Sequence, residues 1–264
     1  MTWKAIARSA IGTSHLKLNM PCQDYGSYRV LNKVIVGAVA DGAGSAKYAD
    51  IGAKLAVDTV LEHFTKFEAW LRKQKPFWHR DFPPLTDQQA TRIFAKAVKK
   101  VAAVLEHQAV TKGYSVHDLA CTLLIVIATP NWIAAMQIGD GFIAVRFLDQ
   151  LQVLFSPDKG EYINETTFVT SANALKAMRV CIHKAKPEFI CAATDGLERV
   201  AIRMSDSTPF SPFFQPLEAY LHEFGNPEAE DEYLSSFLDS DRLNARTDDD
   251  KTLLLCLYED SKRS

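Results

Sequence analysis

The amino-acid sequence predicts an α+β fold whose β-sheets are buried on both faces. Two long segments, 49–71 and 87–110, repeat apolar residues at steps of three and four, which is typical of one face of a helix. Shorter aliphatic segments of strand length are more numerous, and they cover 33–41, 122–129, 132–140, 142–148, 188–195 and 252–258. Several of them are apolar at consecutive positions, which indicates burial on both faces. Sheets covered on both sides by helices, or by a second sheet and helices, would satisfy this pattern.

The breaks between these segments are marked by proline and by turn-forming residues. The segment 75–85, KPFWHRDFPPL, separates the two helices, because its prolines cannot continue either of them. The sequence Thr-Pro-Asn at 129–131 predicts a turn that joins two strands as a hairpin. At 205–240, a stretch rich in Ser, Pro and Phe is followed by two short helical patterns, which predicts a loop with a small helical insertion.

Composition and charge exclude several classes of protein. With 264 residues, 47% of them hydrophobic, the chain can bury one large core, and we expect a single domain over 1–264. The net charge of -2 argues against nucleic acid as a partner. The five cysteines form no CxxC pair, as in a reducing cytoplasm, and the longest apolar run, 123–128, is far too short to span a membrane. We therefore expect a cytoplasmic monomer without nucleic-acid or membrane partners.

Aspartates occur where the apolar strands end or begin. Asp41 follows one strand in VGAVADGAGS, Asp140 another in MQIGDG, Asp195 a third in CAATDGL, and three acids at 248–250 precede the last strand. A carboxylate at such a point is held on rigid backbone, and the following glycine lets the main chain turn sharply. Several hard oxygen ligands at one sheet end suit Mg²⁺ or Mn²⁺ better than zinc, which prefers His and Cys.

An ordinary turn is the alternative explanation for each of these aspartates. A single Asp-Gly after a strand is more often a turn than a ligand, because both residues are common in turns. Four such sites on separate strands change that balance. Carboxylates clustered within a few ångströms repel by about 1 kcal/mol or more per pair, so their convergence would require a cation.

The motifs around these acids follow one another in a recognisable order. They are QD at 23–24, ADGAGS at 40–45, GD at 139–140, TDGL at 194–197 and DDDKT at 248–252, and together they resemble the protein phosphatase 2C family. The stretches GTSH, PCQD and GEYINETTF are similar to a compact bacterial branch that stands alone without an attached sensor domain. The resemblance implies a four-layer αββα sandwich, in which helix pairs flank two antiparallel β-sheets. It also implies a dinuclear metal centre at one end of the sandwich.

The resemblance implies which residues bind the two core ions, Mn²⁺ or Mg²⁺. By this likeness Asp41 bridges both ions, the Gly42 carbonyl binds one of them, and Asp195 and Asp249 complete the set. Asp41, Asp195 and Asp249 are then the catalytic residues, acting through the metal-bound water. The family's Asp-Asp-x-Thr pattern before the final strand selects Asp249, which leaves Asp248 as a solvated or outer acid.

Two further acids correspond to outer ligands of this centre. Asp24 matches the acid near the amino terminus that the family places in the centre, mostly through metal-bound water. Asp140 matches the ligand of a third, weaker ion, which it would share with Asp195. The full metal-binding set implied by the resemblance therefore contains Asp24, Asp41, Gly42, Asp140, Asp195 and Asp249.

The sequence departs from the family's pattern at the phosphate-binding position. Many relatives have Arg five residues before the first acid, whereas this chain has Asn19 there. His15 or Lys17 is left to bind the substrate phosphate, although His15 could equally satisfy a turn or lie at the surface. Ala43 stands where eukaryotic relatives often have His after Asp-Gly, and Gln23 replaces an acid that is often found beside the first Asp.

The activity that the resemblance implies is hydrolysis of phosphoserine and phosphothreonine on proteins. The reaction would use water activated by two metal ions, without a covalent enzyme intermediate. The partners would be phosphorylated proteins and an opposing serine/threonine kinase. The segment 156–181 falls where the family has a mobile flap beside the active site. The alternatives are a catalytically weak phosphoprotein-binding relative and a metal-dependent adhesion module, whose Asp-x-Ser-x-Ser signature fails here at Ala43.

Overall fold

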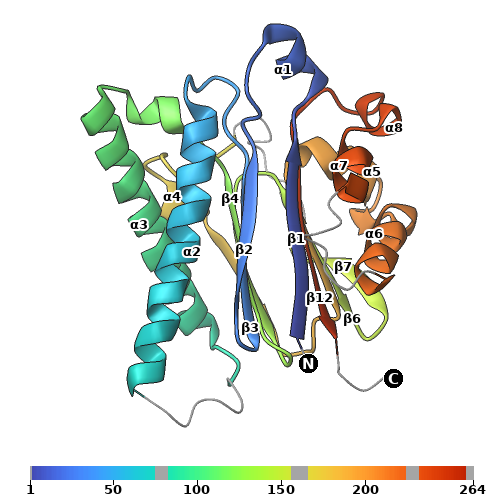
Figure 1. Cartoon of the computed structure of the whole chain (residues 1–264). Helices are drawn as coiled ribbons and strands as arrows, with labels where there is room; N and C mark the ends of the chain where they lie inside the picture. Colours follow the sequence, from blue (N-terminus) through green and yellow to red (C-terminus); the bar gives the residue numbers. More distant parts are fainter. Residues whose placement is uncertain (1, 75–82, 156–165, 224–231, 260–264) are drawn as a thin grey trace.

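Two antiparallel β-sheets face each other at the centre of the molecule (Figure 1). The structure is a computed structural model, and it describes residues 2–74, 83–155, 166–223 and 232–259. The first sheet contains, in spatial order, β1 (Thr2–Ala10), β12 (Lys251–Glu259), β9 (Phe189–Ala193), β6 (Phe142–Phe147) and β7 (Gln150–Val153). The second sheet contains β2 (Tyr25–Leu31), β3 (Val34–Ala40), β4 (Leu123–Ala128), β5 (Ile133–Ile138) and β8 (Arg179–His183).

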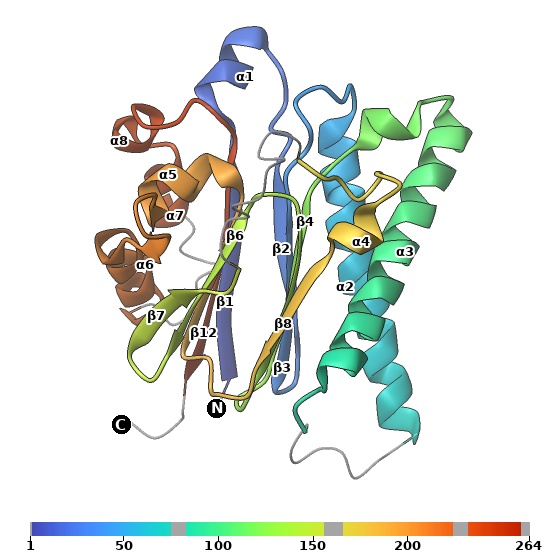
Figure 2. The same ribbon diagram turned by 180° about the vertical axis from the view of Figure 1, so that it is seen from behind.

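Helices cover the outer face of each sheet, as the views from both sides show (Figures 1 and 2). Two long helices, α2 (Ala49–Gln74) and α3 (Asp87–Lys112), lie on the second sheet. The first sheet is covered by α6 (Ser211–Glu223) and α7 (Glu232–Leu238), together with the short helices α5 (Glu198–Ala201) and α8 (Asp241–Asn244). The predicted αββα sandwich is therefore confirmed.

The remaining described elements are short. They are α1 (Thr13–Leu18), the 3₁₀ helices η1 (Val116–Leu119) and η2 (Asp195–Leu197), α4 (Ala174–Ala177), and the two-stranded sheet of β10 (Ile202–Arg203) and β11 (Thr208–Pro209). Helix α1 stands at the end of the sandwich opposite the two chain termini (Figure 1). No helix in the described part of the chain is both long enough and apolar enough to cross a membrane.

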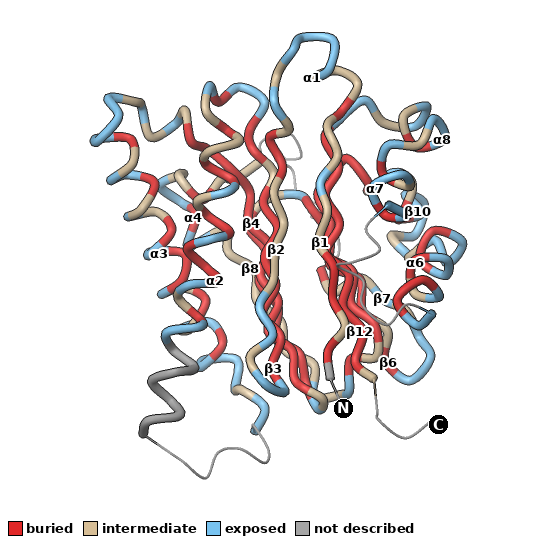
Figure 3. Tube along the Cα trace, viewed as in Figure 1, coloured by how far each residue is buried: buried red, intermediate tan, exposed pale blue. Residues whose placement is uncertain are grey.

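The strands are apolar at consecutive positions because both faces of each sheet are covered. In β12, Leu253 and Leu255 pack in the cluster beneath the outer helices, whereas Leu254 and Cys256 pack between the two sheets. Figure 3 shows the buried positions running along the central strands. Full burial of an aliphatic side chain contributes about 1.5–3 kcal/mol, so burial on both faces of the sheets stabilises the fold strongly.

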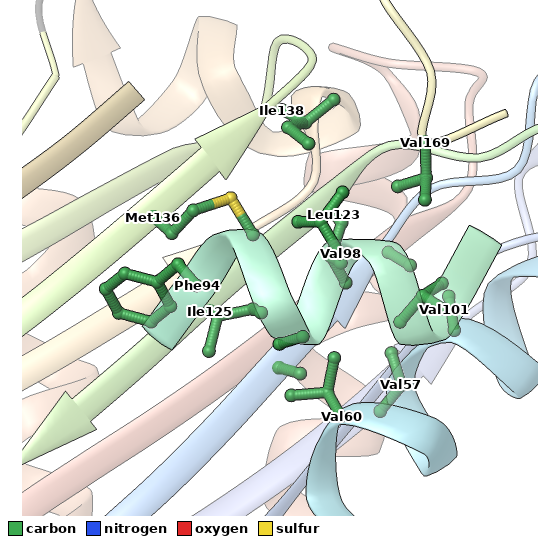
Figure 4. Close-up of a cluster of buried hydrophobic side chains, with 14 of the residues drawn as sticks. Val57, Val60, Phe94, Val98, Val101, Leu123, Ile125, Met136, Ile138 and Val169 are labelled. Atoms are coloured by element: carbon green, nitrogen blue, oxygen red, sulfur yellow. The ribbon is translucent and has the colours of Figure 1, made fainter. Parts of the chain in front are cut away.

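The cluster beneath α2 and α3 accounts for the helical periodicity of those segments. Phe94, Val98 and Val101 of α3 are buried against the second sheet, where they meet side chains of β4 and β5 (Figure 4). Helix α3 begins at Thr86 with a capping box that includes Gln89, and it ends at Gly113 in the left-handed conformation. The predicted helices at 49–71 and 87–110 are both present.

The six strands that the sequence predicts are all present, but among the described strands it does not predict the edge strands β1, β2, β7 and β8 or the two-residue strands β10 and β11. Of these, β1 and β2 contain small or polar residues such as Ala7, Ser9, Gly26 and Ser27 that have weak strand propensity. Each strand pairs along its length with a strongly apolar partner, β12 or β3, and this pairing stabilises it.

Three predicted segments are only partly covered by the described residues. Most of the loop 75–85 lies outside them, as does 156–165 of the flap-like segment 156–181. The rest of that segment contains α4 and the beginning of the edge strand β8. Within 205–240, the described residues form β11, α6 and α7, and these two helices belong to the outer layer over the first sheet.

Candidate metal centre

Three aspartates from three strand ends meet at one end of the sandwich. Asp41 follows β3, Asp140 follows β5, and Asp195 follows β9, so the first two come from the second sheet and the third from the first. Carboxylate oxygens of these three residues all lie within 4.8 Å of one another. The convergence that the sequence only suggested is therefore present in the structure.

Asp24 and Asp249 lie beside this cluster. Asp24 is buried, and its Oδ2 accepts a hydrogen bond of 2.6 Å from the Thr194 hydroxyl. Thr194 directly precedes Asp195, and a Cβ atom on Gly196, directly after Asp195, would lie 3.5 Å from the Cβ atom of Asp249. Asp249 itself is exposed. Five of the predicted acids are thus gathered in one region.

Burial of these carboxylates opposes their ionisation. Burial is the largest cause that raises the pKa of Asp24 to about 8, with a further contribution from the charge of Asp250. Burial and the charges of Asp24 and Asp195 raise the pKa of Asp41 to about 11. Burial and the charge of Asp140 raise the pKa of Asp195 to about 6. Divalent cations among these oxygens would remove the repulsion, so the donor set fits Mg²⁺ or Mn²⁺.

The backbone around Asp41 is fixed by hydrogen bonds across the second sheet. Its N–H donates to the Thr122 hydroxyl at 3.0 Å, and its carbonyl accepts from the Thr122 N–H at 2.8 Å. The next residue, Gly42, donates to the Gln23 carbonyl at 3.1 Å. A Cβ atom on Gly42 would lie 2.6 Å from the Cβ atom of Ala49, so only glycine fits here.

Asp250 holds the amino-terminal loop against the start of β12. Its buried carboxylate accepts hydrogen bonds from the N–H groups of Gly12 at 2.6 Å and Gln23 at 2.5 Å. The Nδ1 atom of His15 lies 3.0 Å from the same carboxylate. The Asp250 N–H in turn donates to Oδ1 of Asp249 at 2.8 Å, which fixes that acid as well. The sequence predicts no such role for Asp250, because nothing local to the motif indicates these distant contacts.

His15, Lys17 and Asn19, near the expected phosphate-binding position, differ in their contacts. His15, in α1, contacts Asp250 through Nδ1, and because a carboxylate only accepts hydrogen bonds, Nδ1 carries the hydrogen. Lys17 is exposed on the same helix. Asn19 ends α1 in the left-handed conformation, with φ of 53°. Within the described part of the chain, His15 alone of the three forms a hydrogen bond with an acidic residue beside the site.

Threonine hydroxyls support the acids, and sequence reasoning did not single them out. The Thr194 hydroxyl that binds Asp24 also accepts from the Thr252 N–H at 2.9 Å. The Thr166 hydroxyl donates to Oδ2 of Asp140 at 2.6 Å. Thr194 and Thr252 lie within the TDGL and DDDKT motifs, so their position beside the aspartates was the available signal.

The chain matches a known protein family over most of its length. Residues 11–239 match the family model described as protein phosphatase 2C. The chain belongs to the protein phosphatase 2C family. It is 34% identical over 265 residues to serine/threonine-protein phosphatase 3 of Escherichia coli strain K12, with 98% of this chain and 99% of that protein covered. The predicted family, and with it the class of metal-dependent serine/threonine phosphatase, is confirmed.

Solved structures support the fold of this protein phosphatase 2C member. The serine/threonine phosphatase Stp1 from Staphylococcus aureus matches with a TM-score of 0.62 at 14% identity, covering 98% of this chain and 96% of that one. A serine/threonine phosphatase from S. agalactiae matches with a TM-score of 0.63 at 14% identity, covering 97% and 100% of the two chains. At such low identity, the likeness establishes the fold alone.

The raised pKa values predict that stabilisation of the protein by Mn²⁺ grows with pH. The folded pKa values of Asp24, Asp41 and Asp195 exceed the ordinary value of 3.8. The metal-free folded state therefore holds more protons than the unfolded state above about pH 4, and this stabilising contribution is lost as pH rises through the folded pKa values. Cations compete with those protons, so the increase in melting temperature caused by saturating Mn²⁺ should be larger at pH 8 than at pH 5.

Thermal unfolding followed by circular dichroism, with EDTA or with Mn²⁺ at each pH, measures this difference. Asp24→Asn, which cannot ionise, is the matched variant and should show a weaker dependence on pH. An increase in melting temperature that is the same at both pH values would contradict the prediction.

Proposed function

We propose that this member of the family removes phosphate from phosphoserine and phosphothreonine side chains of proteins, with water as the nucleophile and no covalent enzyme intermediate. The observation that supports this most is the meeting of Asp41, Asp140 and Asp195 within 4.8 Å at the end of the sandwich. Family membership already implies phosphoprotein substrates. Hard carboxylate oxygens around a shared position are the ligand type used by enzymes that hydrolyse phosphate esters with metal ions.

We propose two core ions, Mn²⁺ or Mg²⁺, and a third, weaker one. Asp41, Gly42, Asp195 and Asp249 would hold the core pair, Asp24 would contribute through water, and Asp140 would hold the third ion with Asp195. The chemistry that such ions supply is activation of a water molecule at neutral pH and neutralisation of charge on the phosphoryl oxygens. Support comes from the carboxylates that lie together, and from burial and the charges of neighbouring acids, which raise the pKa of Asp41 and Asp195.

The protein's own groups would orient the site before substrate arrives. The Thr194 hydroxyl orients Asp24, and the two backbone hydrogen bonds to Thr122 fix Asp41. Because these partners are buried, the carboxylates do not have to reorganise during the reaction. In this proposal Asp41, Asp195 and Asp249 are the catalytic residues, and they act through the activated water.

His15 is our candidate for the phosphate contact that relatives make with arginine. Its Nδ1 atom contacts Asp250, so the ring is oriented, and Nε2 is the nitrogen that remains for a substrate oxygen.

We further propose that residues 1–264 form one catalytic domain of a cytoplasmic monomer, and that this enzyme reverses the action of a serine/threonine kinase. The net charge of -2 is consistent with partners other than nucleic acid.

Phosphate release from a phosphothreonine peptide should require both the metal and Asp41. With Mn²⁺ the unsubstituted protein should release phosphate, and EDTA should abolish the release. Asp41→Asn should reduce the rate at least about a hundredfold, because loss even of an outer contact in a metal site costs about 10- to 100-fold. Asp58→Asn makes the same chemical change on α2 and should leave the rate unchanged. Activity that survives EDTA and Asp41→Asn would refute the proposal, and peptide binding without release would favour a phosphoprotein-binding role.

Two neighbouring aspartates should differ in metal binding. Asp249→Asn should weaken Mn²⁺ binding at least about tenfold, as expected for a lost ligand. Asp248→Asn should leave Mn²⁺ binding unchanged. The hydrogen bonds of Asp248 to Ser14 are accepted by its backbone carbonyl, which the substitution does not alter. Isothermal titration calorimetry measures both affinities. Equal losses in the two variants would overturn the assignment of Asp249.

A substitution at His15 should separate phosphate binding from support of Asp250. In His15→Asn, the amide nitrogen can replace Nδ1 as the donor to Asp250, but nothing replaces Nε2. The KM for a phosphothreonine peptide should rise about tenfold, since a hydrogen bond to a charged group contributes about 1.5–3 kcal/mol. Mn²⁺ affinity should stay the same. An unchanged KM in steady-state kinetics would exclude His15 from phosphate binding.

A further inference from the structure

A buried glutamine binds the main chain on both sides of Asp140. Gln137 lies near the end of β5 with 5% of its surface exposed. Its Nε2 atom donates to the Gly139 carbonyl at 2.9 Å and to the Gly141 carbonyl at 2.6 Å. Both hydrogens of one side-chain amide are therefore used on the two residues that flank Asp140.

The segment held in this way crosses from one sheet to the other. Strand β5 belongs to the second sheet and β6 to the first, and residues 139–141 connect them. Asp140 is the middle residue of this crossover, so its carboxylate can meet Asp41 from one sheet and Asp195 from the other. The amide of Gln137 fixes the crossover at both of its ends.

The crossover also packs tightly against Thr122 and against the strand that precedes Asp195. A Cβ atom on Gly139, whose φ is +97°, would lie 2.5 Å from Cγ2 of Thr122, the residue that binds the Asp41 backbone. A Cβ atom on Gly141 would lie 2.6 Å from the carbonyl oxygen of Ala193, two residues before Asp195. A shift of the crossover would therefore disturb contacts to both neighbouring strands.

The oxygen of the Gln137 amide is not stabilised by a hydrogen bond within the described residues. Within the described residues, Oε1 of Gln137 is buried and has no hydrogen-bond partner. A buried acceptor without a partner is unfavourable, and an apolar side chain of similar size would avoid that cost. The benefit of glutamine at this position therefore lies in its nitrogen and in the crossover that the nitrogen holds.

We propose that Gln137 is a positioning residue of the metal centre, which sets Asp140 relative to Asp41 and Asp195 by binding both carbonyls of the crossover. This role rests on the proposed metal centre and adds to it a residue that contributes no ligand atom. Supporting residues of this kind commonly change metal affinity by about 10- to 100-fold when they are removed.

Mn²⁺ titrations of Gln137→Met test the role. Methionine keeps the approximate size of the side chain but donates no hydrogen bond. Binding of the ion that depends on Asp140 should weaken at least about tenfold, as measured by isothermal titration calorimetry and by electron paramagnetic resonance of bound Mn²⁺. Met136→Val, a substitution in the core on the other face of β5, is the matched control and should keep the native Mn²⁺ affinity and spectrum.

A double variant separates positioning from a general loss of stability. If Gln137 acts through Asp140, Gln137→Met should have no further effect on Mn²⁺ binding in a protein that already carries Asp140→Asn. Additive losses, or native Mn²⁺ binding by Gln137→Met, would overturn the role. If circular dichroism shows Gln137→Met to be unfolded, Gln137→Asn replaces it with the same expectations, because its amide is too short to reach both carbonyls.

The outcomes also distinguish this role from the proposed function. If the unsubstituted protein binds no Mn²⁺, the proposed metal centre fails, and the role of Gln137 fails with it. If the unsubstituted protein binds Mn²⁺ and releases phosphate while Gln137→Met binds Mn²⁺ equally well, only the role of Gln137 is overturned.

Discussion

The acidic end of the sandwich depends on the hydrogen bonds to the buried Asp250 carboxylate. They connect β12 with Gly12, which is 238 residues away in the chain, and with Gln23, beside Asp24. The carbonyl of Gln23 then accepts from Gly42, the neighbour of Asp41. A continuous series of short contacts therefore runs from the last strand to the strand end that carries Asp41. Loss of the carboxylate would leave buried N–H groups unpaired, at a cost of about 1–3 kcal/mol each.

Stability and function place opposite demands on the middle of the central strands and on the strand ends that carry the acids. Along their length the strands bury aliphatic side chains on both faces, and this burial drives the sheets together. At the end, the same approach of the sheets brings Asp41, Asp140 and Asp195 together and raises the pKa of Asp41 and Asp195. A cation relieves the repulsion between these carboxylates, so metal binding and folding of this end of the sandwich should stabilise each other.

Much of the fold could be predicted because its central elements have strong local signals. Helix α3 has an apolar face, a capping box at Thr86 and a glycine at its end, and the six predicted strands are continuous aliphatic runs. The edge strands β1 and β2 lack such a signal, because an edge position tolerates small and polar residues. Their conformation comes from pairing with β12 and β3, an interaction between segments that local sequence does not encode.

The sequence by itself determined the chemistry of the candidate site: aspartates at strand ends, each beside glycine or another acid, in an order that matches the protein phosphatase 2C family. Only the tertiary structure decided how the acids at 248–250 are placed: Asp250 is buried and lies within hydrogen-bond distance of three nitrogen atoms, while Asp248 and Asp249 are exposed. It also decided that His15 contacts Asp250 and that Gln137 binds the crossover. The physical reason is that burial and hydrogen bonding between distant residues are set by the packing of the two sheets, a collective property that no single motif contains.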